Sequence, residues 1–319
     1  MRTLTSTVTV LERPDLATLR LGGNDVLRYL HAVCSQHTLD LTPGDATSAL
    51  LLSPKGKVEF AFRLAVLADG VLLDTDAAGA PALAERLARF VFRYDVTVGP
   101  PQPGAATLLG PGPGAEAALA AAGLPVPPSG RAGLAGAGPD LVVVHRTPAG
   151  ADLVGPGAPA AAAGLERAGA GRGPAERWEP VRVTLGLPRA GLELTDDVLA
   201  EEAGLLGSHV HLDKGCYPGQ ETVARVHNLG QVQRRLAGLR FEPAGGNDGG
   251  PGAGGLPAPR TDLVTDDGRR AGQLRSVVDH PDLGPIGLAY VRRVVETGRL
   301  VRAGDRAATV VELPFGEIS

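Results

Sequence analysis

The most informative segment of the chain covers residues 209–233 and reads HVHLDKGCYPGQETVARVHNLGQVQ. It holds Cys216, one of only two cysteines, and Lys214, one of only three lysines among 31 basic residues. Most of the remaining sequence is rich in Ala, Gly, Arg and Pro, so this segment departs from the general bias. We therefore expect the specific chemistry of the protein to lie here.

The order of residues in this segment favours a reactive thiol. An ammonium close to a thiol stabilises the thiolate, so Lys214 is predicted to make Cys216 nucleophilic. Pro218-Gly219 forms a turn that can open a helix over residues 220–226, and a helix N-terminus also favours an anion nearby. The alternative is that Cys216 is a buried structural thiol in a tight turn.

The segment resembles the signature of the folate-binding YgfZ proteins, which are relatives of the glycine-cleavage T-protein, an aminomethyltransferase. Lys214-Gly215-Cys216-Tyr217, then Gly219-Gln220-Glu221 and Arg225, carry the resemblance. Further matching segments extend over nearly the whole chain: residues 30–44, 53–57, 107–111, 187–189 and 287–291, together with Glu202.

The resemblance implies an α+β fold in which two α+β lobes surround a central folate-binding opening and a C-terminal antiparallel β-barrel follows. It implies tetrahydrofolate, or a one-carbon derivative of it, as the cofactor. It also implies a role in the assembly or repair of iron–sulfur enzymes, including some that modify tRNA, with client or assembly proteins as partners. Cys216 and Lys214 would be the catalytic residues. The residues expected to bind folate or shape the site are Gly215, Tyr217, Gly219, Gln220, Glu221, Arg225, Arg189, Glu202 and Gln36.

Two positions differ from the T-protein. Its catalytic Asp corresponds to Glu59 or to no equivalent residue, and its pterin-binding Glu corresponds to Thr184 in Val183-Thr184-Leu185-Gly186. These departures favour a folate-binding protein that assists iron–sulfur enzymes. Two alternatives remain open: a one-carbon transferase similar to the T-protein, and a non-catalytic folate-binding module.

The distribution of turns and apolar runs predicts four parts. Alternating strands and helices in residues 1–100 indicate a first α+β lobe. Residues 101–175 are interpreted as a second α+β lobe with Gly- and Pro-rich loops, with a linker as the alternative. Residues 176–240 carry the signature and complete the folate-binding lobes. Short β-like runs in residues 241–319 indicate a small barrel.

Composition excludes several other functions. A net charge of −4 and a pI near 6.0 argue against direct nucleic-acid binding, which needs a broad basic face. Two distant cysteines fit neither a disulfide framework nor a four-cysteine cluster, so we expect a cytoplasmic protein. No apolar run suits a membrane span or a signal peptide. His209, His211, Cys216 and His227 could bind a transition metal, but a polar strand followed by an unrelated turn is favoured. Residues 110–114 resemble a dinucleotide-binding loop, but they contain prolines, which lack the N–H groups that a phosphate requires.

Overall fold

The computed structural model describes residues 7–110, 112–128, 130–230, 232–242 and 255–316. The chain forms two compact units. One contains Thr5–Ala175 together with Gly207–Glu221, and we call it the sandwich unit. The other contains Glu176–Leu206 together with Thr222–Ser319, and we call it the barrel unit. The predicted domain boundaries at residues 100, 175 and 240 stay predictions.

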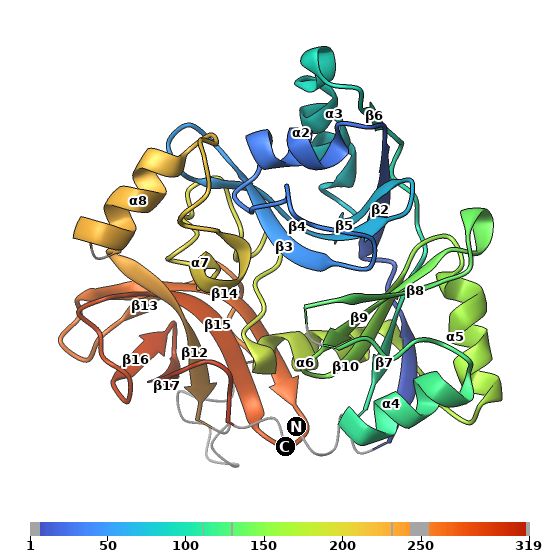
Figure 1. Ribbon diagram of the computed structural model, residues 1–319. Coiled ribbons are helices and arrows are strands. Elements are labelled where there is room, and N and C mark those ends of the chain that lie inside the picture. Colours follow the sequence, from blue (N-terminus) through green and yellow to red (C-terminus); the bar gives the residue numbers. More distant parts are fainter. Residues whose placement is uncertain (1–6, 111, 129, 231, 243–254, 317–319) are drawn as a thin grey trace. The chain divides into compact units, whose positions relative to one another are not determined.

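The first sheet of the sandwich unit has the strand order β3-β4-β5-β2-β6 and is antiparallel (Figure 1). Leu19 and Leu21 on one face pack against Tyr29, Leu30 and Leu83 of two helices. The elements are β2 (Leu16–Gly22), α2 (Val26–Val33), β3 (Ala46–Leu52), β4 (Val58–Leu67), β5 (Gly70–Asp76), α3 (Ala80–Ala88), a 3-10 turn η1 (Val91–Arg93) and β6 (Thr97–Val98).

The second sheet has the order β11-β1-β7-β10-β9-β8. Leu108 and Leu153 lie on the face that packs against Leu119 and Leu165 of the helices α4 and α5. The elements are β1 (Thr9–Glu12), β7 (Ala105–Leu109), α4 (Gly112–Ala121), β8 (Ala132–Ala135), η2 (Gly138–Asp140), β9 (Val142–Thr147), β10 (Gly150–Val154), α5 (Ala158–Arg167) and β11 (Gly171–Gly173). The described parts of residues 101–175 thus form strands and helices rather than a linker, and a separate second lobe with these bounds stays a prediction.

The inner faces of the two sheets pack on each other. Ala65, Leu67 and Leu72 of the first sheet meet Val143 and Val154 of the second. Successive side chains of a strand point to opposite faces, so a residue two positions from an inner one also points inward. The sandwich unit thus has a helix–sheet–sheet–helix arrangement.

The barrel unit contains a closed antiparallel barrel of strand order β12-β15-β14-β13-β16-β17. Helix α6 packs on it through Val183, which contacts the cluster of Ile286, Leu288 and Phe315. The elements are η3 (Ala175–Arg177), α6 (Trp178–Leu185), β12 (Arg234–Phe241), β13 (Asp262–Val264), β14 (Arg270–His280), β15 (Gly284–Arg292), β16 (Leu300–Ala303) and β17 (Arg306–Val311). The α+β class with a C-terminal barrel is confirmed.

Two helices contain positions at which the chain leaves one unit and enters the other. Helix α7 covers Leu206–His209, and α8 covers Gln220–Leu229. The predicted helix over residues 220–226 is present and continues for three more residues. Within the described ranges, no helix combines the length and the apolar character that crossing a membrane requires.

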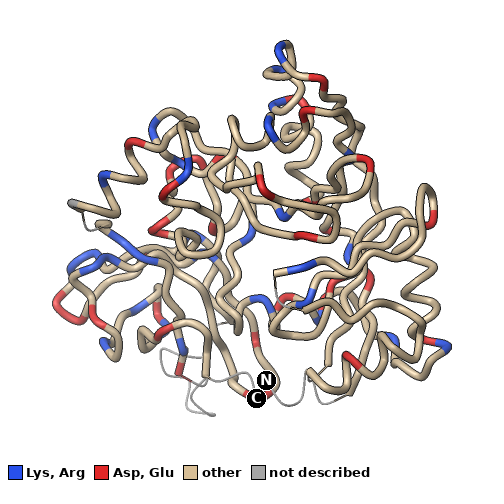
Figure 2. The backbone as a smooth tube through the Cα atoms, in the orientation of Figure 1, with Lys and Arg blue, Asp and Glu red and all other residues tan. Residues whose placement is uncertain are grey.

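Acidic and basic residues are mixed along the chain, as Figure 2 shows. Neither unit carries a long run of a single sign in its described residues. This distribution agrees with the nearly balanced composition of 31 Lys and Arg against 35 Asp and Glu.

Candidate functional site

Lys214 ties the signature loop, residues 213–221, to the segment that follows α2. Its side chain is only 5% exposed, and Nζ donates hydrogen bonds to the carbonyl oxygens of His31 (2.5 Å), Cys34 (2.6 Å) and Gln36 (2.9 Å). Burial lowers the pKa of Lys214, because the charged form loses hydration. Three carbonyl acceptors compensate this loss, so the ammonium acts as a structural clamp between two distant segments.

Gly219 brings the same loop against the hairpin of residues 53–57. It has a φ of +83°, and a Cβ built on it would lie 2.6 Å from the carbonyl oxygen of Ser53 and 3.0 Å from Cα of Gly56. Glycine is required here for both reasons: the backbone is left-handed, and the hairpin backbone occupies the space of a side chain. The signature loop and the hairpin of residues 53–57 are thus in direct contact.

Tyr217 and Gln220 both contact Lys214 within the signature loop. The Tyr217 ring is 8% exposed and its centre lies 5.0 Å from Nζ of Lys214. Burial raises the pKa of Tyr217, so its hydroxyl stays protonated at neutral pH. The side-chain amide of Gln220 donates to the carbonyl oxygen of Lys214 at 3.4 Å. The loop is therefore held by its own side chains as well as by its neighbours.

The two thiols have opposite environments. Cys216 is exposed, whereas Cys34 is fully buried and its pKa is raised by burial. Cys216 is therefore not the buried structural thiol that the sequence left open as an alternative. The described contacts of the Lys214 ammonium are with carbonyl groups and the Tyr217 ring, so its predicted tuning of Cys216 stays a prediction.

A cluster of three histidines lies near the signature loop, and it was not predicted from the sequence. The ring centres of His31 and His37 are 4.8 Å apart, and those of His37 and His211 are 5.4 Å apart. His37 pairs with Asp40 at 3.1 Å, and Nε2 of His31 is 3.8 Å from a Cβ built on Gly215. Burial and then the Lys214 charge lower the pKa of His31, so this imidazole is neutral at pH 7. The cluster thus places three imidazole rings next to one another near the signature loop.

Among the residues that the structure describes, no three His, Cys, Asp or Glu side chains are grouped so that they could hold a metal ion. Nδ1 of His31 accepts a long hydrogen bond of 3.5 Å from the Thr38 N–H.

The remaining predicted residues are divided between the units. Gln36 belongs to the sandwich unit and its amide donates to the carbonyl oxygen of Ser48. Glu221 and Arg225 are exposed on α8. Glu202 and Arg189 belong to the barrel unit. Glu202 is 6% exposed and pairs with Arg234, and Arg189 lies 3.6 Å from Glu179.

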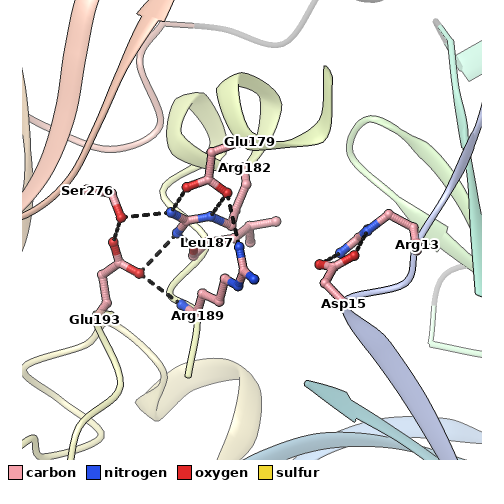
Figure 3. A network of polar contacts seen from close by, with 8 residues as sticks. All are labelled: Arg13, Asp15, Glu179, Arg182, Leu187, Arg189, Glu193 and Ser276. Atoms are coloured by element: carbon pink, nitrogen blue, oxygen red, sulfur yellow. Dashed lines mark hydrogen bonds and ion pairs between the residues drawn. The ribbon is translucent and has the colours of Figure 1, made fainter. Parts of the chain in front are cut away.

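The buried centre of the barrel unit is a network around Arg182, which is drawn in Figure 3. Its guanidinium donates to Glu193 (3.0 Å), to the Leu187 carbonyl (2.7 Å), to Ser276 (2.8 Å) and to Glu179 (3.0 Å and 2.5 Å). Burial alone would lower the pKa of Arg182, but the pairs with Glu179 and Glu193 outweigh it and raise that pKa. The network fixes the turn after α6, which contains Arg189.

A second polar network crosses between the two sheets of the sandwich unit. Arg63 donates to Asp74 (2.8 Å) and to Asp152 (2.7 Å), and Asp152 accepts from Thr107 (2.6 Å). Burial raises the pKa of Asp74, but the Arg63 charge and His145 outweigh burial, and the pKa falls to about 2. Nε2 of His145 lies 3.4 Å from Oδ1 of Asp74, and neither atom has a hydrogen-bond partner among the described residues.

This network was also not predicted from the sequence, although the sequence contains an indication of it. Arg63, Asp74 and Asp152 each interrupt an apolar strand at a position that alternation places on the inner face. Arg13, which is 5% exposed, extends the network by donating to Thr107 at 2.9 Å and to Asp15, a pair visible in Figure 3.

The two positions that depart from the T-protein are already paired. Thr184 is 1% exposed, and its hydroxyl donates to the carbonyl oxygen of Pro180 at 2.8 Å. Glu59 accepts a hydrogen bond from Arg86 at 3.0 Å. Each side chain therefore has a structural partner within its own unit.

The fold is that of the glycine cleavage system aminomethyltransferase T from Bartonella henselae, whose crystal structure the chain matches with a TM-score of 0.80. The match covers 98% of this chain and 88% of the other at 21% sequence identity. At the sequence level, the chain is similar to a protein of Arabidopsis thaliana whose name describes it as a candidate chloroplastic transferase. The two are 32% identical over 141 residues, which is 43% of this chain and 29% of that protein, so the matched region spans less than a third of the relative. No protein-family model matches the chain.

Proposed function

We propose that this protein binds tetrahydrofolate, or a one-carbon derivative of it, and assists the assembly or repair of iron–sulfur enzymes through the thiol of Cys216. The single observation that carries the proposal is an exposed thiol on a loop that Lys214 and Gly219 hold rigidly in place. A reactive cysteine needs access to its partner, and Cys216 has it. The protein would act in the cytosol, with client or assembly proteins of iron–sulfur enzymes as partners and without direct contact to nucleic acid.

The site chemistry favours this role over aminomethyl transfer. The resemblance to the T-protein implies a catalytic Asp and a pterin-binding Glu, which correspond here to Glu59 or no residue and to Thr184. Thr184 has no carboxylate, and its hydroxyl donates to Pro180. Glu59 accepts from Arg86 instead of being free for a substrate. The exposed Glu221 and Arg225 remain accessible to a ligand or partner.

Calorimetry with tetrahydrofolate tests the small-molecule half of the proposal. Saturable heat is expected with the folded protein, and its absence at near-millimolar ligand would contradict folate binding. Complementation tests the thiol. Cys216→Ala is expected to fail in a strain that lacks the protein, whereas Cys34→Ala, which alters a buried thiol, restores iron–sulfur enzyme activity wherever the variant folds.

A one-carbon transferase is the second candidate, and the fold shared with an aminomethyltransferase favours it. Turnover of tetrahydrofolate with an aminomethyl donor distinguishes the two, since the lead proposal expects none. A non-catalytic folate-binding module is the third candidate. It expects that Cys216→Ala still complements, which is the opposite of the outcome stated above.

A further inference from the structure

A pocket of about 460 Å³ opens at one end of the interface between the two sheets of the sandwich unit. Thr18 and Arg20 of β2 line one side, and the turn that carries Asp69 lines the next. The connection from β8 to β9 closes the other side. A volume of this size lies within the range of small-molecule sites, roughly 300–1,000 Å³.

The strand alternation of β2 explains why the pocket has a polar group. Ala17, Leu19 and Leu21 point to the helix-covered face and belong to its core. Thr18 and Arg20 therefore point to the inner face, toward the second sheet. Both residues bring polar groups into a lining that also contains Leu67 and Leu72.

Apart from Thr18, Asp69, Gln102 and Arg20, the residues that line the pocket are apolar or glycine. Leu134 is 36% exposed. The apolar residues of the lining are Leu67, Leu72, Leu134, Leu141, Ala137 and Pro156.

Arg20 is only partly neutralised. Its Nη2 donates to Asp69 at 2.5 Å, but Asp69 is 84% exposed. Its Nη1 is buried and has no hydrogen-bond partner among the described residues. A ligand carboxylate that replaced the exposed Asp69 at Nη2 would form the same charge-assisted pair with the guanidinium.

We propose that this pocket binds a small apolar monocarboxylate, with its carboxylate on Arg20 and its hydrocarbon part against the leucines. Its lining contains none of the residues assigned to the folate site or to the signature loop. It is therefore a second ligand site, and the proposal stands whether or not the protein binds folate.

Methyl NMR of leucine-labelled protein tests the proposal, with phenylpropionate as the probe and phenylpropionamide as its neutral counterpart. Saturable shifts are expected at Leu67, Leu72, Leu134 and Leu141, with a dissociation constant on the order of 1 mM, as suits so small a ligand. The amide is expected to bind roughly tenfold more weakly, because it cannot form the charged pair with Arg20.

Two variants and a control complete the test. Arg20→Gln should remove the preference for the carboxylate, and Ala137→Phe should fill the pocket and abolish binding of both probes. Arg131→Gln is the matched control, because Arg131 is a surface partner of Asp45 outside the lining. The proposal is overturned if the folded wild-type protein shows no saturable shifts, if both probes bind equally, or if Arg20→Gln binds like Arg131→Gln.

Discussion

The ammonium nitrogen of Lys214 lies 2.6 Å from the carbonyl oxygen of Cys34, a residue 180 positions earlier in the chain. Replacing Lys214 with Met should destabilise the protein by about 2 kcal/mol, since three carbonyl groups lose their donor. Urea unfolding followed by circular dichroism measures the change. Lys55→Met, at an exposed position, should stay within about 0.5 kcal/mol of wild type. Equal stability of the two variants would show that the clamp contributes nothing.

Gly219 should not tolerate a side chain. Gly219→Ala places a Cβ 2.6 Å from the Ser53 carbonyl oxygen in a left-handed backbone, and we expect a loss of at least about 1 kcal/mol. Gly215→Ala is the matched control in the same loop, because its nearest neighbour is Nε2 of His31 at an ordinary 3.8 Å. The melting temperatures of the two variants, measured by thermal unfolding, test this prediction. A Gly219→Ala variant that melts together with Gly215→Ala would contradict the close approach.

The two thiols should differ in their reaction with a thiol reagent such as dithionitrobenzoate. In the folded protein one thiol per chain is expected to react, since Cys216 is exposed and Cys34 is buried; both should react in denaturant. Cys216→Ser should remove the native signal, and Cys34→Ser should leave it. Rapid labelling of Cys34 in the folded state would refute the assignment.

Arg63 should be among the most sensitive positions. Arg63→Met leaves the buried carboxylates of Asp74 and Asp152 without their cation, and a loss of about 3 to 5 kcal/mol is expected. Arg131→Met breaks the surface pair with Asp45 and should lose less than about 1 kcal/mol. Urea unfolding compares them. The network would be energetically unimportant if both losses were alike.

His209 should make the protein sensitive to acid. Burial, and secondly the Arg63 charge, lower its pKa to about 4. An unfolded chain with an ordinary histidine pKa of about 6.5 then binds more protons, so stability is lost as the pH falls from about 6.5 toward 4. Between pH 7 and pH 5 this amounts to about 2 kcal/mol. His209→Gln should reduce the measured loss over that interval by this amount, and an unchanged pH profile would disprove the assignment.

The parts of the structure that follow from local pattern could be predicted from the sequence. The strands β2, β4 and β14 lie where apolar alternation places them, and the barrel follows from short strands separated by turns. The signature loop and the hairpin of residues 53–57 were both singled out. That they touch through Gly219 depends on tertiary contacts that no local pattern contains.

The polar networks could not be predicted from the sequence, for a different reason. Lys214 stands out in the sequence as a rare lysine, but its hydrogen bond to the Cys34 carbonyl depends on how the chain folds. Arg63 and Asp152 were detectable as charged residues in apolar strands, but their pairing requires knowing which strands face each other. The same applies to the cluster of His31, His37 and His211, because His211 lies in a distant segment of the chain.

The signature loop, residues 213–221, belongs to the sandwich unit although the chain reaches it only after passing through Glu176–Leu206 of the barrel unit. During synthesis the ribosome adds about 5 to 20 residues per second, so the sheets of this unit emerge seconds before the loop that completes them. Until the loop has been synthesised, the carbonyl groups of His31, Cys34 and Gln36 lack the ammonium group of Lys214 as a hydrogen-bond donor. A fragment that stops at residue 175 would lack an integral piece of its own unit, so the protein cannot be divided into two independent parts by a single cut.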